Sequence, residues 1–153
     1  MGKFYERVSR GLILHVRHLG WLSAVPKPPE GTVRAKATEP RHSRLEQLQA
    51  KKITPQLPPN PAPLITNRLW EIGPVESYGM GSFPISWLAI NEWQRATDVR
   101  LTPWEARMLR RLSSEYLVEQ RKGEDENRPP PWRGEVTQAE RDADEAALRA
   151  VLG

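Results

Sequence analysis

Proline dominates the N-terminal part of this 153-residue chain and limits the structures that it can form. Nine of its 15 prolines lie between residues 26 and 63. Because proline fixes φ and lacks a backbone N–H, no long helix or sheet is expected to cross this stretch. Residues 41–52 lie in the longest proline-free gap of this stretch and predict a short helix capped by Ser43, with Glu46 at its third position. We therefore predict that residues 22–63 form a linker, largely disordered when the chain is alone.

Charge divides the chain into three zones. Residues 1–60 carry 11 Lys and Arg against 4 Asp and Glu, a net charge of +7. Residues 61–122 carry 8 against 7, a net of +1, and residues 123–153 carry 4 against 8, a net of −4. The sequence thus predicts a basic arm and Pro-rich linker over 1–63, a helical module over 64–122, and a charged linker with an acidic helix over 123–153.

Composition excludes several classes of protein. The absence of Cys rules out a disulfide scaffold, a Cys-ligated zinc site and a cysteine nucleophile. His15 and His18 would share a helix face, but no further ligand lies near them in sequence, so we expect no metal and no cofactor. No apolar run approaches the roughly 18–20 residues of a membrane span. The central module contains no His and no selective pairing of carboxylates, so no enzyme is expected.

A helix is expected from about residue 5 to residue 21, weakened by Gly11 and Gly20. Two interpretations are open for it. The first is a basic amphipathic anchor for a membrane surface or a partner. The second is a marginal helix that folds only against something else. We favour the second interpretation.

Three helices are expected in the central module. The first ends at Ile72 and is capped by Thr66 or Asn67. Ser86 caps the second, over residues 87–96, and Thr102 caps the third, over residues 103–121. Between the first two, residues 77–84 contain two glycines and a proline and are predicted to form a turn-rich loop. The glycine pair lacks the lysine and preceding strand of a phosphate-binding loop.

Four of the six Trp lie in the central module and provide its candidate core and its candidate contacts. Trp93 and Trp104 are expected in the core, and the positions of Trp70 and Trp87 are less certain. The candidates for either core or partner binding are Trp70, Gly79, Gly81, Trp87, Trp93, Trp104 and Tyr116.

The tail begins with a charged, Pro-containing linker in which Trp132 is expected to be exposed or docked on a partner. Thr137 and Glu140 predict a capping box at the start of a helix over residues 138–152. This helix either docks on a basic partner, such as the arm of another copy, or stays solvated. Together these features predict an all-α, partly disordered protein with a three-helix centre.

A series of short motifs over residues 64–118 resembles the small tail assembly chaperones of long-tailed bacteriophages and prophages. In order, the motifs are Leu69-Trp70-Glu71, Gly79-Met80-Gly81 with Pro84, Ile85-Ser86-Trp87 with Glu92-Trp93, Leu101-Thr102-Pro103-Trp104-Glu105, and Leu112 with Tyr116-Leu117. Two positions depart from the family. It often has Asp where this chain has Ser113, and Gly in the loop that precedes Leu101.

The resemblance implies a non-enzymatic protein that coats the long, helical tape measure protein before the tail tube polymerises. Such a protein would act in the cytoplasm of the bacterial host and be absent from the finished virion. It leaves self-association open and implies neither a membrane nor nucleic acid as partner. Two alternatives stand beside it: a small basic nucleic-acid-binding or regulatory protein that uses residues 1–60, and a minor structural tail protein.

Overall fold

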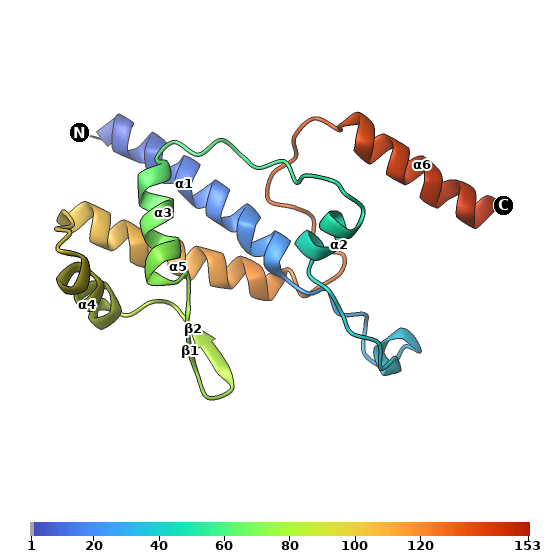
Figure 1. Ribbon diagram of the computed structural model, residues 1–153, viewed down its shortest axis with the longest axis horizontal. Helices are drawn as coiled ribbons and strands as arrows, with labels where there is room; N and C mark the ends of the chain where they lie inside the picture. Colours follow the sequence, from blue (N-terminus) through green and yellow to red (C-terminus); the bar gives the residue numbers. More distant parts are fainter. Residues whose placement is uncertain (1) are drawn as a thin grey trace.

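Two long helices, α1 (Gly2–Ser23) and α5 (Pro103–Lys122), pack along each other in the computed structural model, which describes residues 2–153 (Figure 1). Shorter elements surround them. These are the helices α2 (Arg44–Ala50), α3 (Pro63–Ile72), α4 (Trp87–Thr97) and α6 (Gln138–Leu152), the 3-10 turn η1 (Arg34–Lys36), and the strands β1 (Glu76–Tyr78) and β2 (Gly81–Phe83).

Four helices begin where the sequence places their caps. In each, a Ser or Thr oxygen accepts a hydrogen bond from the backbone N–H three residues later, which satisfies one of the free donors of the first turn. The pairs are Ser43 with Glu46, Ser86 with Ala89, Thr102 with Glu105, and Thr137 with Glu140. The predicted α6 and the predicted end of α3 at Ile72 are also confirmed.

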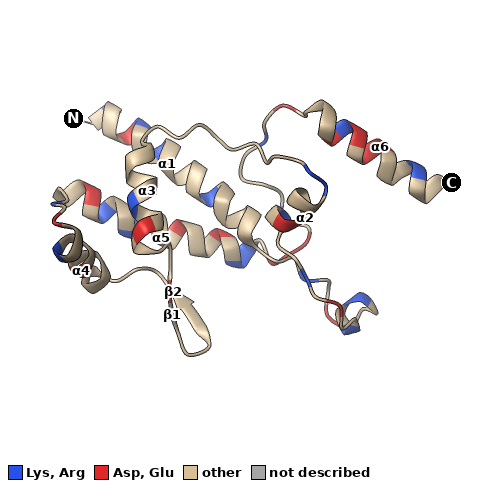
Figure 2. Ribbon diagram, viewed as in Figure 1, with Lys and Arg blue, Asp and Glu red and all other residues tan. Residues whose placement is uncertain are grey.

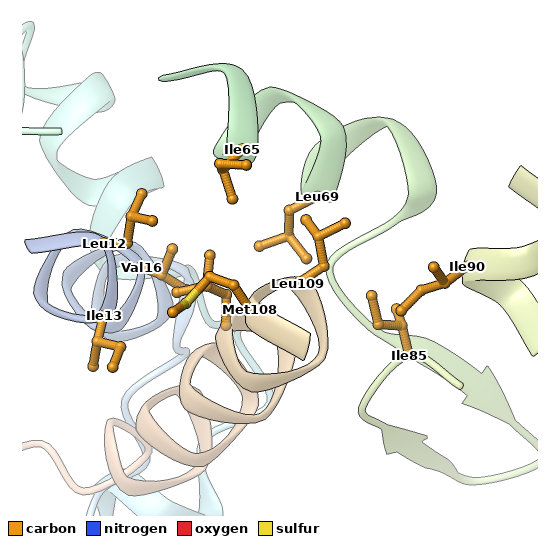
Figure 3. Close-up of a cluster of buried hydrophobic side chains, with 10 residues drawn as sticks. Leu12, Ile13, Val16, Ile65, Leu69, Ile85, Ile90, Met108 and Leu109 are labelled. Atoms are coloured by element: carbon orange, nitrogen blue, oxygen red, sulfur yellow. The ribbon is translucent and has the colours of Figure 1, made fainter. Parts of the chain in front are cut away.

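The core joins α1 to the central helices. Leu12 and Val16 of α1 are fully buried, and they meet Leu69 of α3 and Leu109 of α5 in one hydrophobic cluster (Figure 3). The core therefore crosses the boundary drawn from the sequence at residue 63. The helix expected over 5–21 runs over 2–23 because its apolar side has a partner within the same chain.

The prediction that residues 22–63 are disordered is wrong. Proline removes donors but leaves carbonyl groups free to accept, and side chains of the helices donate to these carbonyls. The ring of His15 is hydrogen-bonded through Nδ1 to Pro58 O at 2.8 Å. Further along, Lys27 N donates to Glu124 O at 2.8 Å, which joins the two linkers in an isolated parallel bridge.

Arg44 is the main connection between these linkers. Only 9% of it is exposed, and its guanidinium donates to three backbone carbonyls, those of Trp21, Gly123 and Asp125, at 2.6–3.1 Å. Its guanidinium carbon also lies 4.4 Å from the centre of the Trp21 ring. One side chain thus fixes the ends of α1 and α5 against the start of α2.

The all-α prediction is wrong at residues 76–83, which form an antiparallel hairpin instead of a turn-rich loop. Tyr78 pairs with Gly81, so Gly79 and Met80 form a two-residue turn. Gly79 has φ +55°, and a glycine with positive φ at the first turn position matches the twist of a hairpin. Since the strands have only three residues each, their alternation was too short to detect in the sequence.

Helix α3 starts three residues before the predicted caps. Pro63 occupies its first turn, where a missing N–H costs nothing. Thr66 is buried inside the helix, donates to Pro63 O at 3.0 Å and accepts from Asn60 Nδ2 at 2.9 Å. Its hydroxyl therefore stabilises the turn without capping it.

The C-terminal linker is also held against the helices. Trp132 is half-buried and packs edge-on against His18, with ring centres 5.8 Å apart. Arg128 forms two hydrogen bonds with the carboxylate of the buried Glu119, at 2.9 and 3.1 Å. Within residues 2–153, no helix has the length and apolar character needed to cross a membrane.

Candidate protein-interaction surface

Large apolar side chains are exposed in the hairpin and at the start of α4. Met80 is fully exposed, and Tyr78, Phe83, Trp87 and Leu88 are between 45% and 70% exposed. We name these five residues the hairpin–α4 surface. In Figure 1 the hairpin projects from the body of the molecule below α3, with α4 beside it. Clusters of exposed large hydrophobic residues are a feature of protein-binding surfaces.

The hairpin presents two aromatic rings together. Tyr78 is on β1 and Phe83 on β2, and their ring centres are 6.2 Å apart. The close pairing of Ser77 with Ser82 fixes the register between them. The register therefore determines that both rings project from the same face of the two strands.

A single hydroxyl holds both ends of the hairpin segment. Ser113 of α5 is fully buried, donates to Pro74 O at 2.7 Å and accepts from Ile85 N at 2.9 Å. Both bonded groups are backbone groups that have to be satisfied in the interior. Ser113, one of the two departures from the family pattern, thus closes the segment 74–85 into a loop with fixed ends.

Glu76 connects the hairpin to α4. Its carboxylate accepts from Ser86 N at 2.9 Å and from Ser86 Oγ at 2.8 Å, and the Tyr78 hydroxyl donates to its other oxygen. The backbone bond from Ser86 lowers the pKa of Glu76 most, and the bonds from Tyr78 and the Ser86 hydroxyl lower it further. The carboxylate remains ionised and orients the aromatic residue next to it.

Two arginines of α5 also hold this region. Arg110 donates from Nε to Ile85 O at 3.2 Å and places its guanidinium 5.0 Å from the Trp87 ring centre. Arg121 donates to Ser82 O at 2.5 Å. The apolar side chains are therefore exposed on a backbone that is fixed at several points.

The remaining candidate residues are dispersed. Trp70 lies edge-on to Tyr116 at 5.5 Å, between α3 and α5, and is 37% exposed. Trp104 packs against the core and lies 5.1 Å from Tyr5 of α1. Trp93 is half-buried on α4, and its buried Nε1 has no hydrogen-bond partner within residues 2–153.

The structure thus brings some of the predicted candidate residues together and adds exposed residues that were not predicted. Trp87 belongs to the hairpin–α4 surface, Gly79 to the hairpin turn and Gly81 to β2, whereas Trp104 and Tyr116 contact other helices. Tyr78, Met80, Phe83 and Leu88 are exposed but were not among the candidate residues predicted from the sequence. The signal that could have found the first three is the Gly79-Met80 dipeptide, which fits a two-residue hairpin turn.

His15 and His18 are both buried on α1, where they contact the linkers. In the described part of the chain, no three His, Asp or Glu side chains are grouped to hold a metal ion. Both histidines therefore belong to the packing of the linkers.

None of the known family models, curated proteins or solved structures matches this chain.

Proposed function

We propose that this chain is a non-enzymatic tail assembly chaperone that binds the tape measure protein during assembly of a bacteriophage tail, in the cytoplasm of the host. The observation that carries the proposal is the hairpin–α4 surface. It lies within the segment 64–118, whose motifs resemble this family, and it exposes large apolar side chains on an anchored backbone.

The surface has properties that are typical of protein-binding surfaces. Aromatic residues and Met are enriched at protein interfaces, and the surface contains Tyr78, Met80, Phe83 and Trp87. The bonds from Ser113, Glu76 and Arg110 fix its backbone in the free protein. A preorganised surface loses less conformational entropy on binding, so more of the contact energy becomes affinity.

The nucleic-acid alternative has less support, because several basic side chains of the arm are already engaged. Arg44 is buried on backbone carbonyls, Arg17 pairs with Glu115, and Arg34 pairs with Glu126. Binding carried by phosphate contacts would need these charges free to release counterions. The alternative of a minor structural tail protein uses the same surface and differs only in whether the chain remains in the particle.

The proposal is tested by co-expression of the tagged chain with its neighbouring genes, followed by affinity capture and mass spectrometry. A parallel sample is treated with nuclease. We expect to recover one long, helix-rich protein whose capture is insensitive to nuclease. Recovery of nucleic acid alone, lost at moderate salt, would contradict the proposal.

Two variants locate the contact. Met80→Ser combined with Leu88→Ser removes two exposed side chains from the surface, and we expect binding to weaken at least about tenfold. The matched control is Val33→Ser combined with Val136→Ser, which removes exposed apolar side chains elsewhere. Circular dichroism checks that both proteins are folded. Equal binding by the two variants would exclude the hairpin–α4 surface as the contact, and purified particles that contain the chain would favour the structural alternative.

A further inference from the structure

Helix α6 has an apolar side that no other part of residues 2–153 covers. No residue of α6 is buried, and its apolar residues Leu148, Val151 and Leu152 are 58%, 83% and 77% exposed. Their spacing of three and four residues places them on one side of the helix. The hydrogen bonds and ion pairs of its side chains remain within the helix and its cap, for example Arg149 with Glu145.

An open groove of about 1040 Å³ lies at the other end of the molecule, between the first half of α1 and the first half of α5. Its apolar residues are Tyr5, Ile13 and Trp104, and its basic residues are Arg10, Arg107 and Arg111. Apolar grooves between helices are a common docking site for an amphipathic helix.

The charges of the groove and of α6 are complementary. Glu105 lines the groove, but Arg68 pairs with it at 2.5 Å, so its charge is compensated. Arg111 pairs with Glu115 at 3.9 Å, so Arg10 and Arg107 remain against Glu6, and the groove is positive overall. Helix α6 contains four acidic and two basic residues (Figure 2). Its acidic residues lie over 140–145, and the exposed apolar residues follow from Leu148 onwards. The helix therefore carries negative and apolar side chains, and the groove carries positive and apolar ones.

We propose that α6 of one molecule docks in the α1–α5 groove of a second copy of this chain. Figure 1 shows why the second copy is favoured over the same chain: α6 extends away from the body, at the end opposite the N-terminus of α1. The segment before α6 is held there, because Gln56 Nε2 donates to Glu135 O and Trp132 packs against His18.

Sedimentation and light scattering of the full chain over a range of concentrations test the proposal. We expect self-association that weakens in high salt, since part of it is electrostatic. Leu148→Asp combined with Leu152→Asp alters only exposed positions of α6, and Arg10→Glu combined with Arg107→Glu reverses the groove charge. Each variant is expected to weaken association at least about tenfold. The control is Val33→Asp, at an equally exposed apolar position.

Mixing the two variants identifies the pairing. The α6 variant retains an intact groove and the groove variant retains an intact α6, so together they can form one native contact. We expect the 1:1 mixture to recover a heterodimer that neither variant forms as a homodimer. A chain that remains monomeric at all concentrations, or a mixture without heterodimer, would overturn the proposal.

A cross-link separates docking between copies from docking within one chain. The chain contains no Cys, so Ser9→Cys in the groove and Val151→Cys in α6 introduce the only thiols. We expect oxidation of a mixture of the two single variants to give a disulfide-linked dimer. A variant that carries both substitutions would give only an internally linked monomer if α6 folded back on the groove of its own chain. That result would also overturn the proposal. Since neither measurement involves the tape measure protein, the outcome is independent of the proposed function.

Discussion

Gly20 of α1 lies directly against the backbone carbonyl of Tyr116 in α5. A Cβ atom built on Gly20 would stand 2.5 Å from Tyr116 O, closer than real Cβ contacts. The two longest helices of the core are therefore in direct backbone contact at a position where one of them has no side chain. The glycine that weakens α1 as an isolated helix thus allows it to pack.

Gly20→Ala is therefore expected to destabilise the protein, although Ala favours helix formation by about 1 kcal/mol over Gly. The inserted methyl group would have to move backbone atoms of α5, and overpacking of this kind costs about 1–3 kcal/mol. Urea unfolding followed by circular dichroism measures the change. Gly2→Ala, also in α1, meets nothing within 4 Å and serves as the control. A Gly20→Ala protein as stable as the wild type would contradict the observed helix contact.

Ser113→Ala is expected to lower the free energy of unfolding by about 1–3 kcal/mol, because it leaves two buried backbone groups without a partner. These groups are Pro74 O and Ile85 N. Hydrogen exchange should also accelerate at the amide of Ile85. Ser114→Ala, on the adjacent and less buried residue, is the control. Unchanged exchange at Ile85 would exclude the role of this hydroxyl in fixing the hairpin.

Arg44→Ala is expected to release the linkers from the helices. The substitution removes a guanidinium that donates to three carbonyls, and a single hydrogen bond to a charged group contributes about 1.5–3 kcal/mol to stability. Hydrogen exchange should increase over residues 24–53 and 123–128. Arg44→Lys should restore the protection from hydrogen exchange only in part, because an ammonium group lacks the planar geometry of guanidinium. The exposed Arg41→Ala should leave the exchange pattern unchanged.

The stability of the protein is expected to fall below about pH 6.5 through His18. Burial lowers the pKa of His18 below its ordinary value of 6.5, and the nearby His15 lowers this pKa further. A hydrogen bond with the Gln56 backbone acts in the opposite direction and raises it. The unfolded chain then binds the proton more readily than the folded chain. The contribution of His18 to the free energy of unfolding is complete above pH 6.5 and is lost as the pH falls towards the lowered pKa of the folded state.

Thermal melting between pH 5 and pH 8 measures this dependence. His18→Gln should flatten the part of the profile below pH 6.5, and His42→Gln, at an exposed position, should not. A wild-type profile that His18→Gln leaves unchanged would show that another group causes the pH dependence.

The features that the sequence predicted correctly are those determined within a few residues. Ser43, Ser86, Thr102 and Thr137 start helices because a hydroxyl reaches an N–H three residues away, whatever surrounds it. The buried side of α5 has an equally local origin, since 3.6 residues per turn places Met108, Leu109 and Leu112 together.

The predictions that were wrong concern segments whose hydrogen-bond partners are distant in the sequence. The Pro-rich segment was predicted to be disordered because it cannot satisfy its own backbone, but His15 and Arg44 satisfy its carbonyls and those of the linker it meets. The hairpin was predicted as a loop because its stability depends on Ser113 and Arg121, some 30 to 40 residues away. The same reason kept the exposed residues Tyr78, Met80 and Phe83 out of the predicted site.

The sequence by itself determined the capped starts of four helices and the segregation of charge into a basic arm and an acidic tail, since propensity, capping and composition are local properties. Only the tertiary structure decided that α1 belongs to the core, that the prolines are ordered and which aromatic residues are exposed. Those outcomes depend on which donor each carbonyl group meets and on how closely the backbones of α1 and α5 approach at Gly20. No local sequence pattern specifies which distant group will be the partner.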